Sequence, residues 1–314
     1  MELYVTGRSA IRIWKSLSAG VANAGQLFTM PEEHTPKLSR PEANALAEEF
    51  DLVLPINVAV KKAKNRRNSS RLACTCYGAS SDKYQYLQVR EGLYIARPEA
   101  CLMQLATTCS TVDLAFLASE LCACYSIEAD EIHKREPVCT KQGIVEYLAE
   151  CHNAHGQAGL ERIIPYILEG SISPMQSVLA LMLCLPVRWG GYGFAMPQLN
   201  SSIEVPALSI DAEMYNCSPD LLWPARKLVV QYEGARWGTD WERSVSAQRM
   251  HNDLVAAGYT VLEMSDDQLL STSVMDGLAA YIARILRKSA PALDEAAVAL
   301  RRELRQELLV VSRL

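Results

Sequence analysis

The sequence predicts a chain of mixed α/β class with two domains, over residues 1–170 and 171–314. The length of 314 residues exceeds one ordinary core and fits two domains of roughly 100 to 200 residues each. Strand-like alternation recurs between stretches in which apolar residues have helical spacing. A second series of helix and strand signals begins at Ser173, after helices that are closed by glycines. We therefore expect an α+β domain followed by an α/β domain.

In the first domain, a helix is predicted to open at Ser9, because Ile11, Trp14 and Leu17 share one face. The Pro-rich, charged segment that follows it, residues 31–44, is expected to be a loop. Two short strands, separated at Pro55, are predicted within 51–60. Other short strands are predicted at 72–77, 84–89 and 92–96, and helices at 96–110, 112–127, 142–156 and 159–170.

The second domain begins with a helix that Ser173 caps and Pro174 opens. Strand-like segments follow at 201–215, 219–224 and 227–234, then a polar helix at 240–257, a strand at 259–265 and helices from residue 266 onward. The predicted order is therefore helix, three strands, helix, strand and further helices.

Composition limits the possible classes of protein. Hydrophobic residues make up 49% of the chain, which is enough for two cores and excludes a disordered or collagen-like protein. No run of about 18 uncharged apolar residues occurs, and the first residues lack the pattern of a secretion signal. We therefore expect a cytoplasmic protein with no membrane partner.

The ten cysteines are expected to be free thiols rather than disulfides or zinc ligands. Cys74 with Cys76, and Cys122 with Cys124, are spaced one residue apart, whereas zinc knuckles usually have two intervening residues.

One short stretch is strongly basic in a chain whose net charge is −5. Its cations are Lys61, Lys62, Lys64, Arg66, Arg67 and Arg71. A loop of this kind can bind the phosphates of DNA without reading sequence, or it can be an ordinary solvated loop. The sequence does not choose between these interpretations.

Four separated segments of the second domain carry a resemblance to a known family. SPMQSVL, CSPDLLWP, KLVVQYEG and NDLVAAGYTVLEMSDDQL occur in this order. They resemble the very-short-patch-repair-like endonuclease domain of the PD-(D/E)XK superfamily. The resemblance implies a restriction-endonuclease-like core, in which helices flank a mixed sheet of about four strands.

The first domain is similar, over shorter segments, to AbiEi-type antitoxin and regulator proteins. The segments that carry this similarity are GRSAIRIW, LPINVAV and GLYIARPEACLMQLA. The alternative is an unrelated α+β domain.

The nuclease resemblance implies a catalytic site around a Mg²⁺ ion. Asp220 matches the first metal ligand, but the second carboxylate position holds Gln231, and a supporting acid on the first helix is replaced by Gln176. Glu233 lies two residues after Gln231, on the same face of a strand, and can supply a charge. Because Mg²⁺ prefers carboxylate oxygens, we expect weak metal binding. Arg249 and Arg236 are expected near nucleic-acid phosphate.

Two functions follow from these residues. The first is a nucleic-acid-associated regulatory, antitoxin-like or defence-related protein whose degenerate nuclease domain cleaves weakly or not at all. The alternative is an active Mg²⁺-dependent DNA endonuclease that uses Asp220 and Glu233. DNA is the expected partner of either, and a protein partner is possible for the first. Taken singly, Asp220 can instead cap a turn and Glu233 can be an ordinary acid at a strand end.

Overall fold

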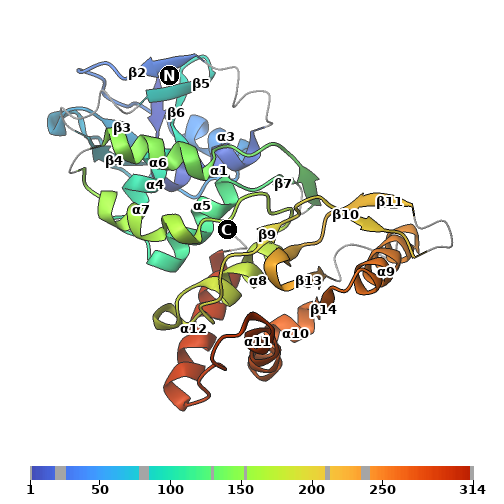
Figure 1. Ribbon diagram of the computed structural model, residues 1–314. Helices are drawn as coiled ribbons and strands as arrows, with labels where there is room; N and C mark the ends of the chain where they lie inside the picture. Colours follow the sequence, from blue (N-terminus) through green and yellow to red (C-terminus); the bar gives the residue numbers. More distant parts are fainter. Residues whose placement is uncertain are drawn as a thin grey trace. The chain divides into compact units, whose positions relative to one another are not determined.

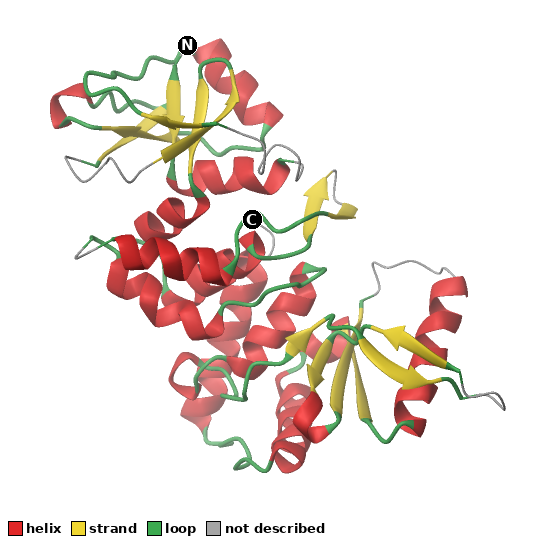
Figure 2. Ribbon diagram, turned by 45° about the horizontal axis from the view of Figure 1, so that its top comes forward, coloured by secondary structure: helices red, strands yellow, loops and turns green. Residues whose placement is uncertain are grey.

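The structure is a computed structural model (Figure 1). It describes residues 2–17, 26–77, 85–128, 131–151, 154–208, 213–234 and 241–311. The chain divides into two compact units, residues 1–167 and 168–314, three residues before the boundary that the sequence predicts. Each unit contains helices and a mixed sheet, so the predicted α/β class is confirmed (Figure 2).

The first unit is built on a six-stranded sheet with the order β2-β5-β6-β1-β3-β4. Strand β1 is parallel to β6 and antiparallel to β3, and β3 is parallel to β4. Its strands are β1 (Leu3–Val5), β2 (Leu27–Thr29), β3 (Ile56–Val60), β4 (Leu72–Cys76), β5 (Gln85–Arg90) and β6 (Leu93–Ala96). The central strand β1 is fully buried, as its apolar sequence Leu-Tyr-Val requires.

Helices pack around this sheet and against one another. Helix α1 contacts α4, β3 and β6, and the indole N–H of Trp14 donates to the carbonyl of Ala96 at 2.8 Å. The helices and the remaining short elements are α1 (Gly7–Ser16), α3 (Arg40–Glu49), a 3₁₀ turn η1 (Ala63–Asn65), α4 (Pro98–Leu105), α5 (Thr111–Leu121), the hairpin β7 (Tyr125–Glu128) and β8 (Glu131–Lys134), α6 (Lys141–Glu150), α7 (Gln157–Ile163) and a 3₁₀ turn η3 (Ile164–Tyr166).

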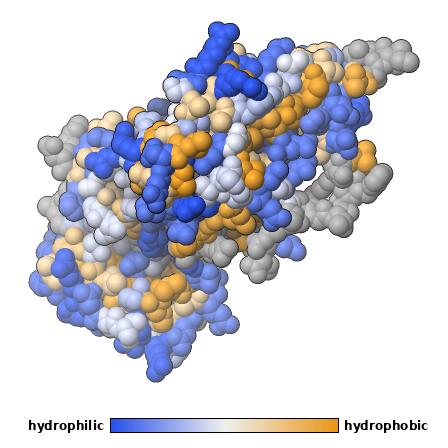
Figure 3. Space-filling view, turned by 90° about the horizontal axis from the view of Figure 1, so that it is seen from below, coloured by the Kyte–Doolittle hydropathy of each residue, from blue (hydrophilic) through white to orange (hydrophobic). Residues whose placement is uncertain are grey.

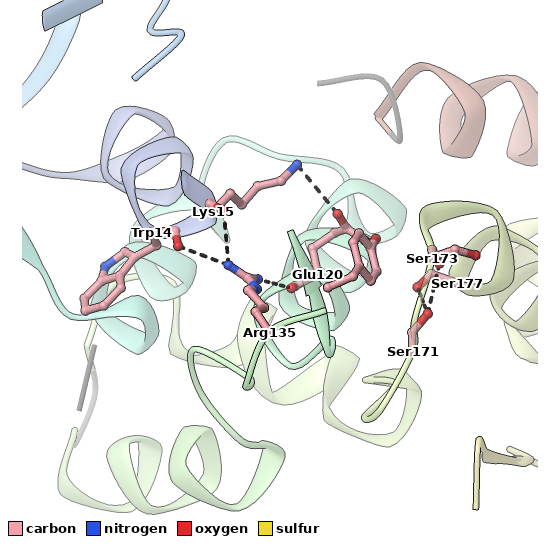
Figure 4. A network of polar contacts seen from close by, with 8 residues as sticks. Trp14, Lys15, Glu120, Arg135, Ser171, Ser173 and Ser177 are labelled. Carbon is pink, nitrogen blue, oxygen red and sulfur yellow. Dashed lines mark hydrogen bonds and ion pairs between the residues drawn. The ribbon is translucent and has the colours of Figure 1, made fainter. Parts of the chain in front are cut away.

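A buried polar cluster fastens the segment after β8 to the ends of α1 and α5 (Figure 4). The Arg135 guanidinium donates to the carbonyls of Trp14 at 3.1 Å and Glu120 at 3.1 Å. The Glu120 carboxylate lies 3.6 Å from the Lys15 ammonium and accepts a hydrogen bond from Tyr125. Burial raises the pKa of Glu120 and lowers that of Arg135. The Glu120 charge is paired with Lys15, and the Arg135 charge is held by backbone carbonyls.

The second unit contains a four-stranded mixed sheet with the order β14-β13-β12-β9. Strand β12 is antiparallel to β9 and β13, and β13 is parallel to β14. The elements up to β14 are α8 (Pro174–Cys184), a 3₁₀ turn η4 (Val187–Trp189), β9 (Gln198–Leu199), β10 (Ile203–Pro206), β11 (Met214–Cys217), β12 (Leu221–Trp223), a 3₁₀ turn η5 (Pro224–Arg226), β13 (Leu228–Glu233), α9 (Trp241–Ala256) and β14 (Thr260–Ser265). Strands β10 and β11 form a separate antiparallel hairpin.

One face of this sheet packs against α9 and the hairpin. Leu222 and Val229 are paired across β12 and β13, and both join a cluster with Leu254 of α9 and Val205 of β10. Helix α8 contacts β13. The remaining helices are α10 (Asp266–Leu270), α11 (Thr272–Leu286) and α12 (Glu295–Val311). Helix α12 packs on α8 and on η4.

A buried ion pair holds α12 to α11. The Arg301 guanidinium lies 2.7 Å from the Asp276 carboxylate, which also accepts a hydrogen bond from the Tyr192 hydroxyl at 2.7 Å. The Arg301 guanidinium also stacks on the Tyr192 ring. The loop that carries Tyr192 therefore depends on both terminal helices for its position.

The structure corrects three local predictions in the first unit. Helix α3 begins inside the predicted loop 31–44, where Ser39 and Glu42 form a capping box. Only one strand, β3, forms within 51–60. The predicted helix 112–127 ends at Leu121, because the chain turns there into the β7–β8 hairpin. Strand β1, before Gly7, is an element that the sequence prediction lacked.

All ten cysteines are free of disulfide bonds, which confirms that part of the prediction. Among the described residues, no helix is long and apolar enough to cross a membrane. Hydrophilic and apolar residues are interspersed over the face drawn in Figure 3.

Candidate functional site

The N-terminus of α8 positions a buried amide at the start of the second unit. The Ser173 hydroxyl caps the helix by accepting a hydrogen bond from the backbone N–H of Gln176 at 3.1 Å. The Gln176 side chain is only 1% exposed, because it points into the fold rather than to solvent. Ser171 and Ser177 lie beside it, with their hydroxyl oxygens 2.8 Å apart (Figure 4). This first turn therefore provides a rigid support for the Gln176 amide.

Gln176 uses both ends of its amide. Its oxygen accepts hydrogen bonds from the Ile172 backbone N–H at 2.9 Å, the Asn200 amide at 2.9 Å and the Ser171 hydroxyl at 3.1 Å. Its nitrogen donates to the Asn200 amide oxygen at 3.1 Å and to the Asp220 carboxylate at 3.0 Å. These contacts saturate the amide and fix its orientation.

Asn200 links this helix to the strand that carries Asp220. It has a positive φ of 48°, a conformation that asparagine tolerates better than most residues. Its backbone N–H donates to the Asp220 carbonyl at 3.1 Å, and its side chain donates to the Gly170 carbonyl at 2.7 Å. The residue therefore joins three segments that are distant in sequence.

The Asp220 carboxylate is held on both oxygens by protein N–H groups. One oxygen accepts from Gln176, and the other accepts from the Tyr232 backbone N–H at 2.7 Å. The pKa of Asp220 is raised to about 7. Burial is the largest cause, the Gln176 hydrogen bond lowers the pKa, and the negative charge of Glu233 adds to the rise. A substantial fraction of Asp220 is therefore protonated near neutral pH.

Strand β13 brings Gln231 and Glu233 to this region. The Gln231 amide oxygen accepts from the Asp220 backbone N–H at 3.0 Å, while its buried amide nitrogen has no hydrogen-bond partner among the described residues. Glu233 is exposed at the end of the strand. Glu233 influences the pKa of Asp220, so the structure brings the three residues predicted for catalysis into one region.

A polar cavity of about 310 Å³ adjoins the end of β13. Glu233, Glu263, His251 and Asn252 contribute to its lining. Glu263 lies on β14, in register with Gln231, and its carboxylate is 2.6 Å from the His251 imidazole. The sequence offers no local signal for a partner of His251, which stands alone among polar residues of its helix. The pairing with Glu263 became visible only when α9 and β14 were placed side by side.

The residues around Asp220 are a poor fit for Mg²⁺. No group of three or more His, Cys, Asp or Glu side chains is placed to hold a metal ion within the described part of the chain. Both oxygens of Asp220 already accept hydrogen bonds from the protein, and Gln231 is neutral. Because Mg²⁺ favours an octahedral set of oxygen ligands with carboxylates among them, this donor set does not fit it well.

Of the two arginines expected near phosphate, Arg249 lies on α9. Its guanidinium is 3.8 Å from the Asp253 carboxylate and 5.7 Å from the centre of the Tyr215 ring. Asp253 also accepts hydrogen bonds from the Tyr215 hydroxyl at 2.7 Å and the Leu208 backbone N–H at 2.6 Å. Arg249 is thus placed against the β10–β11 hairpin, although its side chain stays 68% exposed. Arg236 lies outside the described residues.

The basic stretch of the first unit connects β3 to β4. Lys62 pairs with Glu32 and Glu33, and Lys64 pairs with Glu33 at 3.1 Å. These pairs lower the pKa of Glu33, chiefly through the hydrogen bond from Lys62. The remaining cations of the stretch differ in exposure: Arg66 and Arg67 are exposed, whereas Lys61 and Arg71 are partly buried. Part of the positive charge that the sequence suggested is therefore neutralised locally.

Comparison with known proteins adds no assignment. No protein-family model, no curated protein and no solved structure matches this chain. The functional argument therefore rests on the residues and contacts described above.

Proposed function

We propose that residues 168–314 form a degenerate restriction-endonuclease-like domain of the PD-(D/E)XK superfamily. In this proposal the whole chain is a nucleic-acid-associated protein, of regulatory, antitoxin-like or defence-related function, with weak or no cleavage. Apart from the inserted β10–β11 hairpin, the element order α8, β9, β12, β13, α9, β14 supports the proposal. So does the mixed sheet in which the three antiparallel strands precede one parallel strand, since the resemblance implies a core of this kind.

The observation that carries the proposal is the closed hydrogen-bond network around Asp220. Gln176 and Gln231 occupy the positions where the resemblance implies acids, and each uses its amide to bind Asp220. An acid at position 176 would place a second negative charge beside Asp220 in a buried region. The amide donates a hydrogen bond there instead, so the network is stable without a cation.

One observation favours the alternative, an active endonuclease. The charge of Glu233 raises the pKa of Asp220, so these two carboxylates are near enough to interact. A divalent cation between two such carboxylates would relieve their repulsion. The experiment below separates the two functions.

Restoring the missing acids is expected to make the unfolding temperature of the chain depend on Mg²⁺. Gln231→Glu adds a carboxylate and removes the buried amide nitrogen that has no partner. Gln176→Glu then replaces a donor that lies 3.0 Å from Asp220 by a second negative charge. Without metal, both variants should unfold at lower temperature than the wild type, because like charges are forced together. Mg²⁺ should raise the unfolding temperature of the double variant most, and calorimetric titration should show tighter binding at each step.

Cleavage of supercoiled plasmid DNA provides the functional readout. The wild type should leave the plasmid intact in Mg²⁺, and any nicking should appear first in Gln231→Glu and rise in the double variant. Adding Asp220→Asn to the double variant is the control. It should abolish both the tighter Mg²⁺ binding and the nicking. If the double variant binds Mg²⁺ no better than the wild type, these positions do not converge and the superfamily assignment fails. Efficient cleavage by the wild type would establish the endonuclease alternative.

The basic stretch allows a matched test of DNA association. Arg66→Gln/Arg67→Gln removes two exposed cations, whereas Lys62→Gln/Lys64→Gln removes two that are paired with Glu32 and Glu33. The arginine variant should lower DNA affinity and reduce the slope of log affinity against log salt by about two, because each phosphate contact contributes roughly one. The lysine variant, with the same change in formal charge, should reduce the slope less. Fluorescence anisotropy with a labelled duplex measures both, and equal slopes for all three proteins would make this stretch a solvated loop.

A further inference from the structure

Helix α11 carries apolar side chains on the side that faces solvent. Its inner side is buried and includes Met275, Ala279 and Ile282. On the outer side, Val274 is 40% exposed and Tyr281 is 39% exposed. The structure describes this helix throughout, and its exposed positions are Ser273, Val274, Gly277, Ala280, Tyr281 and Arg284. A helix face that meets only water usually carries more charged residues than this one does.

The apolar residues of this face form a stripe with the spacing of a contact between two helices. The stripe consists of Val274, Leu278, Tyr281 and Ile285, which are separated by four, three and four residues. Leu278 and Ile285 are partly exposed. Residues at these separations lie above one another on one side of a helix, and packed helices use the same spacing along their seam.

Gly277 lies beside the middle of this stripe. A Cβ atom built there would have no neighbour within 4 Å, so packing among the described residues does not require a glycine. Glycine in the middle of a helix is less favourable than alanine, because it loses more backbone freedom on folding. On an exposed apolar face, however, it leaves room for a large side chain of a second helix.

The two ends of the face carry opposite charges. Asp266 and Asp267 lie on α10, just before α11, whereas Arg284, Arg287 and Lys288 lie at the C-terminal end of α11. The Arg284 guanidinium is 4.6 Å from the centre of the Tyr281 ring, so the basic end begins beside the stripe. An antiparallel copy of this helix would set each acidic end against a basic end. A parallel copy would bring like charges together.

The stripe is also complementary to itself in the antiparallel direction. With a two-fold axis between positions 277 and 278, Val274 of one copy faces Tyr281 of the other copy. Leu278 of one copy then faces Gly277 of the other copy, where a side chain is missing. A two-fold interface requires one patch that fits itself in this way.

We propose that the chain forms a two-fold dimer in which the α11 stripes of two copies pack antiparallel. The contact of one helix pair is smaller than a standard protein interface, so we expect a weak dimer, with a Kd on the order of 100 μM. The Asp220 network takes no part in this contact. The dimer therefore goes beyond the proposed function and does not depend on it.

Sedimentation equilibrium on the full chain, from about 10 μM to about 500 μM, tests the dimer. The wild type should change from monomer to dimer over this range. Val274→Glu and Tyr281→Lys should each raise the Kd by about tenfold or more, because a charge would be buried among apolar groups. Ala280→Glu is the matched control and should dimerise as the wild type does, since position 280 is exposed but lies to one side of the stripe. A wild type that stays monomeric overturns the proposal, and so does a control that loses as much affinity as Val274→Glu.

An equimolar mixture of the Val274→Glu and Tyr281→Lys chains tests the direction of pairing. In the antiparallel dimer, the new carboxylate of one chain faces the new ammonium group of the other, and the second Val274–Tyr281 contact is unchanged. The mixture should therefore associate more tightly than either variant alone, which also shows that both variants are folded. In a parallel pair, position 274 would face position 274, and mixing would bring no such gain. A mixture that associates no better than the single variants overturns the antiparallel dimer.

Discussion

Replacing Gly190 by alanine is expected to destabilise the second unit by about 3 kcal/mol or more. Gly190 has a φ of +85°, a conformation that costs an L residue roughly 1 to 2 kcal/mol. A Cβ atom built there would lie 2.3 Å from the carbonyl oxygen of Leu300 and 2.9 Å from the Cβ of Leu304. Both belong to α12, and one is a backbone atom that cannot rotate away. The helix would have to move from the loop, and its contact with α8 would loosen.

Gly277→Ala is the matched control for this substitution. Gly277 lies in α11, and a Cβ there would have no neighbour within 4 Å among the described atoms. Alanine should stabilise this helix by up to about 1 kcal/mol, because it loses less backbone entropy than glycine. Urea unfolding followed by tryptophan fluorescence measures both variants, since four of the five tryptophans lie after residue 167. If Gly190→Ala is as stable as the wild type, α12 does not pack on this loop as described.

The order of elements in the second unit could be predicted in part, where its signals are local. The predicted strand 201–215 is instead the separate β10–β11 hairpin, and strand β9 of the four-stranded sheet was not predicted. Ser173 followed by Pro174 marks the start of α8 through hydrogen bonds that span only a few residues. Short apolar runs mark β12 and β13 in the same way, and both runs are buried in the structure. Helix α3 was missed because the Pro-rich, charged segment 31–44, which includes Pro41, was interpreted as a loop. Pro41 lies in the first turn of α3, where backbone N–H groups have no acceptor within the helix. A proline there costs the helix no hydrogen bond.

The candidate site could be predicted only in part. The resemblance selected Asp220, Gln231 and Glu233, but it gave no sign of Asn200, which joins segments 24 residues apart through its pairing with Gln176. The pairing of His251 with Glu263 likewise depends on how α9 packs beside β14. Long-range side-chain pairs leave no periodic signal in a sequence, so they emerge only from the fold.

Asp220 is expected to make the stability of the second unit fall as the pH rises from about 4 to about 7. The folded chain keeps the proton of Asp220 up to about pH 7, whereas the unfolded chain loses it near the ordinary pKa of 3.8. Between these values the unfolded state binds fewer protons, so ionisation favours unfolding. Integrated over this window, the loss is about 4 kcal/mol at most, and it levels off above pH 7.

Asp220→Asn should remove this part of the pH dependence. The variant keeps the size of the side chain and cannot ionise. Its NH₂ group, however, must face one of two N–H donors, Gln176 or Tyr232, and that hydrogen bond is lost. We therefore expect the variant to be less stable than the wild type at pH 5, by about 1 to 3 kcal/mol for one lost buried hydrogen bond. The difference should shrink or reverse at pH 8, where the wild type carries the buried charge. Urea unfolding at pH 5, 6, 7 and 8 measures it.

Glu233→Gln provides an intermediate case that ties this effect to the site. Because the charge of Glu233 raises the pKa of Asp220, its removal should lower that pKa. The fall in stability would then be complete at a lower pH and smaller in total than in the wild type. Other buried acids, Glu120 among them, also titrate with folding, so each variant is compared with the wild type at the same pH. If the Asp220→Asn and wild-type stabilities run parallel from pH 5 to pH 8, Asp220 is ionised throughout. It would then be a carboxylate able to bind a cation, and the case for a degenerate site would lose its main physical support.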